Sequence, residues 1–299
     1  MVDLFITIRN CAIRVVVILI ALILLAPALH AQEGSPCERI IALSPSLVEV
    51  VAALGLTEKL VGVSRFTQYP EAARKLAQVG GFLDPNLEGM LALKPSVVLG
   101  LSEHSDLLEK LKRFGSRTQS ADHRSVVGII ESIKKIGELC QRSGEASQVI
   151  QKLESLLSAY RQKLIGKKRL RTLVLIGGKE DALRFTNLYV SGRDGYYADL
   201  LKIAGAENIF SGITRPFSGV SREAFIKENP DVVFQVVTDA NISASDKEAI
   251  LEAWSDLPFL NAVKRKNIFL LIDYVDVIPG PRFPETLEKM ALALEGAHR

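Results

Sequence analysis

Histidine and cysteine, the side chains that most often hold a catalytic metal, are scarce along the chain. The four histidines stand apart, at His30, His104, His123 and His298. Neither a His-Glu-x-x-His segment nor a paired Cys-x-x-Cys segment occurs, so the sequence indicates neither a zinc enzyme nor a zinc ribbon. We therefore predict no metal site and no resident cofactor.

Sequence segments typical of nucleophilic and phosphate chemistry are also missing. There is no Gly-x-Ser-x-Gly elbow, the turn that exposes a catalytic serine. Gly178-Lys179 follows an apolar run, but Glu180 stands where a phosphate-binding loop has serine or threonine, and Leu173 stands at its first glycine. Carboxylates are numerous, but nothing in their spacing pairs them. We predict that the protein binds a ligand and is not an enzyme.

Polar and aromatic residues gather instead in loops that follow apolar, strand-like runs. In open α/β sheets, ligands bind beyond the carboxyl ends of the strands. Aromatic rings with a few fixed donors suit a large planar ligand with carboxylate or amide edges. We predict that these loops bind a ligand through Ser44, Pro45, Ser46, Arg65, Phe66, Tyr69, Gly81, Phe82, Tyr189, Arg193, Tyr196, Tyr274 and Arg282.

Six short apolar runs predict the strands that must position those loops. Each is bounded by turn residues and separated from the next by stretches with helical spacing. Strands that alternate with helices build mostly parallel sheets, so an α/β fold is expected. The predicted strands are Ile40–Leu43, Leu60–Val63, Val97–Leu101, Leu173–Ile176, Val232–Val237 and Ile268–Ile272.

An internal repeat divides the chain. Residues 86–99 and 221–234 both read as a capping residue, a short helix, a proline and then an apolar strand, with glutamate aligned on glutamate. A weaker echo pairs residues 54–60 with residues 204–209, where glycine closes a helix before a strand. Two echoes in the same order predict two lobes of similar plan.

A longer helical pattern lies between the two copies. From Gly144 to Ile165 the apolar residues recur at helical spacing, and a helix of that length would be roughly 33 Å long, enough to join two lobes. The alternative is an ordinary surface helix. We predict a signal peptide over residues 1–31, an N-terminal α/β lobe over 38–142, a bridging helix over 144–166 and a C-terminal α/β lobe over 170–296.

The N-terminus has the layout of an export signal. Arg9 and Arg14 precede the apolar run of residues 15–25, and small residues follow as far as Ala31. A membrane anchor is the alternative, but an apolar stretch of about 15 residues is short of the ~20 that a spanning helix needs. Cys37 is far from the end of this run and has no aliphatic residue three positions before it, so we do not expect a lipoprotein. We predict export with cleavage of the signal.

Composition and charge exclude several classes of protein. The chain of 299 residues is 48% hydrophobic and 24% charged, with 37 basic against 34 acidic residues, which excludes a disordered chain and provides no basic patch for nucleic acid. In an oxidising compartment Cys37 and Cys140 are allowed to pair. Sequence leaves open whether they form a disulfide or remain two thiols.

Several segments, in order, resemble a known family. They are Arg39-Ile40-Ile41-Ala42-Leu43-Ser44-Pro45-Ser46, Val61-Gly62-Val63-Ser64, Asn86-Leu87-Glu88 with Leu93-Lys94-Pro95, Ser221-Arg222-Glu223 and Gly280-Pro281-Arg282. Residues 38–296 resemble the solute-binding proteins of ABC importers in which one long helix joins two lobes, the class III periplasmic binding proteins. These capture cobalamin, ferric siderophores or haem outside the cytoplasmic membrane.

The resemblance implies a partner and a place of action. It implies a periplasmic monomer that delivers its ligand to a dimeric ABC permease and the attached ATPase. In such proteins one exposed carboxylate on each lobe docks with permease arginines, and Glu88 and Glu223 match those positions. Each also stands in the first turn of an expected helix, where an acid gains stability from the helix dipole, so both roles are open.

The ligand is less well defined than the family. A corrinoid such as cobalamin needs aromatic and amide contacts but no axial ligand from the protein, and the motifs around Gly62 and Glu88 favour it. A ferric siderophore would need several cations, for which Arg65, Arg193 and Arg282 are candidates. Haem would need an axial side chain, with Tyr69, His104, Tyr189 and Tyr274 as candidates.

Two further classes of protein are alternatives that the sequence favours less. The subunit of a metal-cluster enzyme has a related plan of lobes, but it needs cysteine ligands and a cytosolic location. A sensor domain would need a transmembrane or output segment, and the residues after 282 do not predict one.

Overall fold

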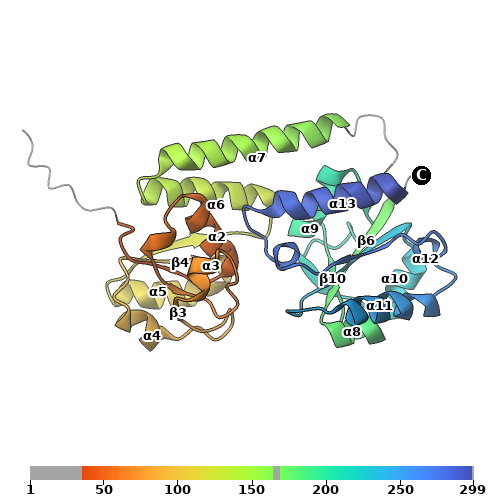
Figure 1. Ribbon diagram of the computed structural model, residues 1–299, viewed down its shortest axis with the longest axis horizontal. Helices are drawn as coiled ribbons and strands as arrows, with labels where there is room; N and C mark the ends of the chain where they lie inside the picture. The colour runs from red at the N-terminus through yellow and green to blue at the C-terminus, as the bar shows by residue number, and fades with distance from the viewer. Residues whose placement is uncertain (1–35, 164–168, 298–299) are drawn as a thin grey trace, which may run out of the picture. The chain divides into compact units, whose positions relative to one another are not determined.

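The computed structural model describes residues 36–163 and 169–297 (Figure 1). The predicted signal peptide, residues 1–31, lies outside the described residues, as do positions 164–166 of the predicted bridging helix. The chain from Cys37 onward forms one compact unit. Within the described residues, no helix is both long and apolar enough to cross a membrane.

The N-terminal lobe is built on a five-stranded parallel sheet in the order β3-β2-β1-β4-β5. Every residue of its central strands β1 and β4 is buried, because helices cover both faces of a parallel sheet. The strands are β1 Ile40–Ala42, β2 Leu60–Val63, β3 Ala77–Gln78, β4 Val97–Leu101 and β5 Arg117–Ala121. The helices are α2 Pro45–Ala53, α3 Glu71–Arg74, α4 Leu87–Ala92, α5 Ser105–Arg113 and α6 Val126–Leu139, with 3₁₀ turns at η1 Thr57–Lys59 and η2 Ser102–His104.

The C-terminal lobe has a mixed sheet in the order β11-β10-β6-β7-β9, with β8 beside β6. Its β10, β6 and β11 are parallel, whereas β7 is antiparallel to both neighbours. The strands are β6 Arg171–Gly177, β7 Tyr189–Ser191, β8 Glu207–Asn208, β9 Phe217–Gly219, β10 Val232–Val237 and β11 Ile268–Leu271. The helices are α8 Lys179–Arg184, α9 Tyr196–Ala204, α10 Arg222–Glu228, α11 Ala244–Ala253, α12 Asn261–Lys264 and α13 Phe283–Ala297, with 3₁₀ turns at η3 Trp254–Asp256 and η4 Tyr274–Val277.

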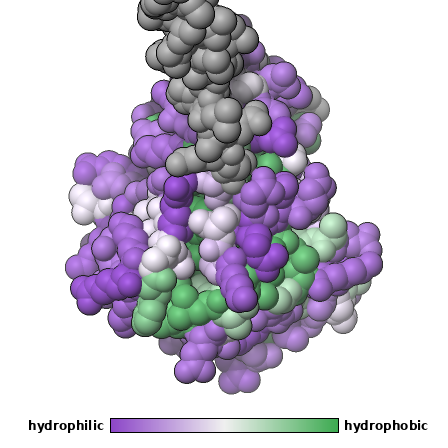
Figure 2. All heavy atoms as spheres, turned by 90° about the vertical axis from the view of Figure 1, so that its left-hand side faces the viewer, coloured by the Kyte–Doolittle hydropathy of each residue, from purple (hydrophilic) through white to green (hydrophobic). Residues whose placement is uncertain are grey.

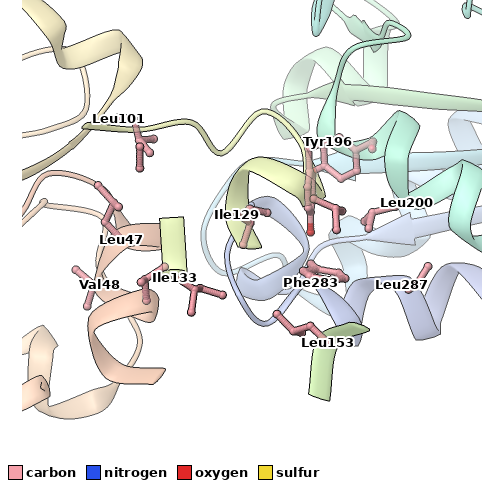
Figure 3. Close-up of a cluster of buried hydrophobic side chains, with 14 of the residues drawn as sticks. Leu47, Val48, Leu101, Ile129, Ile133, Leu153, Tyr196, Leu200, Phe283 and Leu287 are labelled. Atoms are coloured by element: carbon pink, nitrogen blue, oxygen red, sulfur yellow. The ribbon is translucent and has the colours of Figure 1, made fainter. Parts of the chain in front are cut away.

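One long helix, α7 Ser143–Lys163, joins the two lobes (Figure 1). It packs along α6 and touches both α2 of the N-terminal lobe and α9 of the C-terminal lobe. Side chains of α2, α6, α7, α9 and α13 converge in one apolar core, as Figure 3 shows for Leu47, Ile133, Leu153, Leu200 and Phe283. The α/β class predicted from sequence, with two lobes and a long helix between them, is confirmed.

A disulfide ties the first residues of the N-terminal lobe to the end of α6. Cys37 and Cys140 are bonded, with their Cα atoms 5.2 Å apart and a sequence separation of 103. Both side chains lie in the core that the two lobes share. The bond therefore fixes the start of the lobe beside the turn that leads into α7.

Much of the surface of the N-terminal lobe is hydrophilic. Figure 2, which shows the side of the molecule on the left of Figure 1, shows a band of hydrophobic residues among mainly hydrophilic ones. The most exposed large apolar side chains of this lobe are Leu83 at 91%, Val127 at 64% and Phe114 at 63%. Large areas of charged and polar surface agree with the 24% charged composition.

Candidate ligand-binding cleft

A cavity of about 350 Å³ lies between the two lobes. Both lobes contribute residues from beyond the carboxyl ends of their strands, which is where open α/β sheets bind ligands. The N-terminal lobe contributes Ser44, Pro45, Ser46, Phe82, Leu101, Glu103, His123 and Arg124. The C-terminal lobe contributes Ile176, Tyr196, Tyr197, Phe217, Thr238, Val277, Ile278 and Pro279.

The start of α2 and a buried histidine form one wall. Ser44 caps α2 by accepting a hydrogen bond from the backbone N–H of Leu47. The Ser46 hydroxyl lies 2.8 Å from His123 Nδ1, and His123 Nε2 lies 2.7 Å from the Ser132 hydroxyl. Because the Ser132 hydroxyl donates to a backbone carbonyl, His123 donates to it from Nε2 and accepts at Nδ1. Burial lowers the pKa of His123 to about 4, so the ring is neutral at pH 7.

Both ring nitrogens of His104, the other histidine among the described residues, are also hydrogen-bonded. Its Nδ1 accepts from the backbone N–H of Leu101 at 3.1 Å, and its Nε2 donates to the carbonyl of Phe82 at 3.0 Å. Its ring packs edge-on against the Phe82 ring, with centroids 4.8 Å apart. Burial lowers the pKa of His104. His104 therefore holds Phe82 in place, and neither of its nitrogens is left for a metal.

Aromatic rings from both lobes line the cavity. Phe82 belongs to the N-terminal lobe, and Tyr196, Tyr197 and Phe217 belong to the C-terminal lobe. Tyr197 donates its hydroxyl to the carbonyl of Asp276 at 2.7 Å, which fixes its ring. The Tyr196 hydroxyl is buried and has no hydrogen-bond partner among the described residues. This wall offers flat apolar area, which suits a conjugated or macrocyclic ligand.

Only two charged residues occur among the cavity-lining residues that the structure describes, Glu103 and Arg124. Asp122 binds the Arg124 guanidinium with both carboxylate oxygens, one of them 2.9 Å from Nε. This pairing raises the pKa of Arg124 and lowers the pKa of Asp122. The cavity therefore contains one cation that is already paired, and no cluster of free cations.

The structure brings five of the predicted ligand-binding residues to the cavity. They are Ser44, Pro45, Ser46, Phe82 and Tyr196. Gly81, buried beside Phe82, is packed so closely that a Cβ would lie 2.3 Å from Asp84 Oδ1. Phe66 lies next to this loop and is 58% exposed. The roles of Gly81 and Phe66 in binding remain predictions.

Three other predicted residues are not among the residues that line the cavity. Arg65 pairs with Asp84 at 2.8 Å on the surface. Tyr189, expected in a loop, is in strand β7 and is 51% exposed. Arg193 pairs with the adjacent Asp194 and lines a second hollow, of about 840 Å³. Their contact with a ligand remains a prediction.

The last three predicted residues meet where the lobes touch. The backbone N–H of Gln68 donates to the Tyr274 hydroxyl at 3.2 Å. The Arg282 guanidinium stacks on the Tyr69 ring, 4.1 Å from its centroid, and lies 3.5 Å from the Glu49 carboxylate. Tyr69, Tyr274 and Arg282 thus belong to a lobe junction, defined here as these three residues with Glu49 and Gly280.

Glu88 and Glu223 occupy equivalent places in the two lobes. Both are exposed and stand in the first turn of a short helix, α4 or α10. Asn86 and Ser221 cap these helices in the same way, each accepting from the backbone N–H three residues later. The geometry of the repeat predicted from sequence is therefore present at both sites.

Several residues of the cleft and of the lobe junction were not predicted from the sequence. His123 and Arg124 follow β5, whose polar sequence Arg-Thr-Gln-Ser-Ala gives no apolar signal for a strand. Phe217 lies in the three-residue strand β9. Glu49 stands inside the apolar helix α2, and an acid in such a run was the one available signal of a buried charge.

The chain belongs to the periplasmic binding protein family, whose model matches residues 40–274. Its two lobes and long connecting helix are those of the class III periplasmic binding proteins. The ABC transporter substrate-binding lipoprotein YvrC of Bacillus subtilis is 29% identical over 85% of this chain and 79% of its own length. The vitamin B12-binding protein of Vibrio vulnificus is 28% identical over 68% of this chain and 72% of its own length.

Solved structures share the fold. The periplasmic vitamin B12 binding protein BtuF of Vibrio cholerae superposes with a TM-score of 0.74 at 22% identity, covering 88% of this chain and 99% of that one. A periplasmic haem-binding protein of Pseudomonas aeruginosa superposes with a TM-score of 0.73 at 24% identity, covering 86% and 92%. Because proteins with different ligands share this fold, the ligand must be argued from the cleft itself.

Proposed function

We propose that the protein captures a corrinoid in the cleft between its lobes and delivers it to an ABC permease dimer. It acts outside the cytoplasmic membrane and does no chemistry on its ligand. The observation that carries the choice of ligand is the make-up of the cavity, with aromatic walls and a single, already paired cation.

The charge of the cavity favours a ligand with neutral edges. Haem has carboxylate edges, and ferric siderophores are often anionic, so both call for cations that converge on the site. Arg124 is held by Asp122, and Glu103 on the same wall would repel an anion. A corrinoid presents amide edges, which hydroxyl and backbone groups such as those at Ser44 can satisfy.

The state of the candidate axial donors also favours a corrinoid. Haem iron is normally held by a histidine, tyrosine, cysteine or methionine side chain. In the described part of the cleft, His104 and His123 use both ring nitrogens, and Tyr197 donates its hydroxyl to a carbonyl. The Tyr196 hydroxyl has no hydrogen-bond partner among the described residues, but burial raises its pKa, so it keeps its proton and is a poor axial ligand. A corrinoid brings its own axial ligand and needs none of these groups.

The size of the cavity indicates how such a ligand would be held. A volume of about 350 Å³ is at the low end for ligand sites, so one edge of a macrocycle would fill it. The remainder would lie against the mouth, where Phe217 is 47% exposed and where Phe66 follows β2.

Equilibrium titration with three ligands tests this proposal. Cyanocobalamin, haemin and a ferric hydroxamate are each titrated into the mature protein and followed by calorimetry. We expect one cyanocobalamin to bind per protein, more tightly than the other two. Tighter binding of haemin or of the ferric hydroxamate would assign the cleft to that ligand and refute the corrinoid proposal.

Delivery would use the two matching acids. Glu88 and Glu223 are exposed at equivalent positions of the repeat, and charge-assisted pairs with arginine are stronger than neutral hydrogen bonds. The Glu223 carboxylate accepts hydrogen bonds from its own backbone N–H and from the Ser221 side chain. These bonds lower the pKa of the carboxyl and favour its ionised form. One contact per lobe would orient the cleft over a permease with two equivalent subunits.

A further inference from the structure

The lobe junction contains a buried carboxylate with little compensation. Glu49 projects from α2 of the N-terminal lobe, and its side chain is 0% exposed. Neither of its oxygens has a partner at good hydrogen-bond geometry among the described residues, and the backbone N–H of Arg282 is the one donor near enough to lower its pKa. Its nearest cation is Arg282, which comes from the C-terminal lobe and lies 3.5 Å away. An ionised carboxylate in this position is costly, because burial removes its hydration.

The two lobes pack tightly against each other at this point. A Cβ on Gly280 would lie 2.6 Å from Glu49 Oε2 and 3.5 Å from the Cα of Ser46. A side chain at position 280 would therefore have to displace the Glu49 carboxylate, whereas glycine lets the C-terminal segment pack directly against it. Ser46 and Pro279 are neighbours of this contact and line opposite walls of the cavity. The separation at Glu49 thus sets the separation of the walls.

The charges and hydroxyls around Glu49 are few. Arg282 is shared, because it also binds Glu285 through Nε at 2.9 Å and Nη2 at 3.1 Å. The hydroxyls of Tyr196 on α9 and Tyr274 on η4 feel the charge of Glu49. His123 is hydrogen-bonded to Ser46, which lies on the same helix as Glu49, and it is neutral at pH 7. Burial outweighs the attraction of Arg282 and raises the pKa of Glu49 to about 7.

A carboxyl that binds its proton more tightly when buried couples protonation to the closed junction. In a junction open to water, the pKa of Glu49 returns towards its ordinary value of 4.5. Proton uptake therefore favours the closed form, and ionisation favours the open form. With a pKa of about 7 in the closed form, the opening equilibrium should change about tenfold between pH 6 and pH 8.

We propose that Glu49 is a positioning residue for ligand capture, which holds the two cavity walls together when protonated and loosens them when ionised. The effect on the ligand rests on the function proposed above, whereas the effect on the junction does not. Glu49 acts through Gly280 and Arg282, and it does not itself line the cavity.

Amide hydrogen exchange at Gln68 tests the junction without any ligand, because this N–H donates to Tyr274 across it. After correction for the chemical exchange rate, we expect protection of Gln68 to fall about tenfold from pH 6 to pH 8. Glu49→Gln should keep the higher protection at both pH values. Glu288→Gln, which removes an exposed acid of α13, should behave as the unmodified protein. The same fall with pH in Glu49→Gln would overturn the proposal.

A second variant keeps the test decisive if Glu49→Gln folds poorly. Arg282→Gln removes the attraction that lowers the pKa of Glu49, so the midpoint of the change in protection should move to higher pH. An unchanged midpoint would refute the proposal.

The dissociation rate of cyanocobalamin tests the link to capture. We expect dissociation to be about tenfold faster at pH 8 than at pH 6 in the unmodified protein, and slow at both in Glu49→Gln. A pH-independent rate in the unmodified protein would remove Glu49 from capture. If cyanocobalamin does not bind at all, the proposed ligand fails, while Gln68 exchange still decides the junction.

Discussion

At the scale of single residues, the cleft is built from side chains whose polar atoms are mostly occupied. His123 is hydrogen-bonded to both Ser46 and Ser132, and His104 is hydrogen-bonded to the backbone of its own lobe. Such residues give the cavity a fixed shape and offer apolar surface, since their donors and acceptors face other protein groups. Binding should therefore depend on ring contacts more than on charge.

Aromatic truncation tests that dependence. Phe82→Ala removes a cavity-lining ring and should weaken binding of cyanocobalamin by about 1–3 kcal/mol. Phe114→Ala is the matched control, because this ring is 63% exposed at the end of α5 and does not line the cavity. Calorimetry on both variants makes the comparison. Equal affinities for the two variants would remove Phe82 from the binding surface.

The pH dependence of stability gives a second test at this scale. Because burial raises the pKa of Glu49 to about 7, the folded state binds its proton more tightly than the unfolded state does. Its contribution is therefore most favourable at low pH and is lost as the pH rises from about 4.5 to about 7. Glu49→Gln should gain about 2 kcal/mol in free energy of unfolding, relative to the unmodified protein, between pH 5 and pH 8.

The difference between the two proteins is the quantity to measure, because His123 acts in the opposite direction. Its pKa is lowered to about 4, so its contribution is full above about pH 6.5 and is lost as the pH falls towards 4. Urea unfolding gives the free energy of unfolding of both proteins at each pH. The contribution of His123 is the same in both and cancels in the difference. A constant difference across this range would show that Glu49 has an ordinary pKa in the folded protein.

At the scale of the elements, the apolar strands could be predicted and the polar ones could not. All six predicted strands are present, displaced by two residues at most, because β1, β4 and β10 are apolar runs buried on both faces. Strand β5 is polar, and β3, β7, β8 and β9 have two or three residues each. Such short strands are set by pairing with neighbouring strands, which a local pattern does not contain.

The same limit applies to the cleft. Ser44, Phe82 and Tyr196 follow recognisable elements, and their positions could be predicted from those elements. His123 and Phe217 follow or lie in strands that have no apolar pattern. The junction of Glu49 with Arg282 joins residues more than two hundred positions apart, and only the packing of the lobes brings them together.

The disulfide gives a prediction for the elements that it ties. Cys37→Ala with Cys140→Ala should lower the free energy of unfolding by about 4 kcal/mol, because the bond closes a loop of 103 residues. Alanine keeps both sites apolar in the core. Urea unfolding of the double variant measures the loss. A loss below about 1 kcal/mol would show that the bond contributes little to the stability of the fold.

At the scale of the whole molecule, the shared core opposes large movements of the lobes. Helices α2, α6, α7, α9 and α13 meet in one apolar cluster (Figure 3), so wide opening would expose buried surface. We expect the radius of gyration to change by less than about 1 Å on binding cyanocobalamin. Small-angle X-ray scattering measures it, and a decrease of several ångströms would contradict this account.

Docking is tested at the same scale. Glu88→Arg with Glu223→Arg should abolish most uptake in vesicles that contain the permease, because repulsion replaces two attractive contacts. Ligand affinity should be unchanged, since neither residue lines the cavity. Glu109→Arg with Glu248→Arg, exposed acids on other helices, is the control and should retain uptake. Uptake that survives the first double variant would leave both glutamates as ordinary acids at helix starts.

The visible spectrum of the mature protein purified from its native host tests the central claim most directly. Corrinoids, haem and ferric siderophores absorb at different wavelengths, so the bound molecule identifies itself without a choice of probe. We predict the spectrum of a corrinoid at one equivalent per protein, lost in parallel with binding in Phe82→Ala. The spectrum of haem or of a ferric chelate at one equivalent would contradict the account.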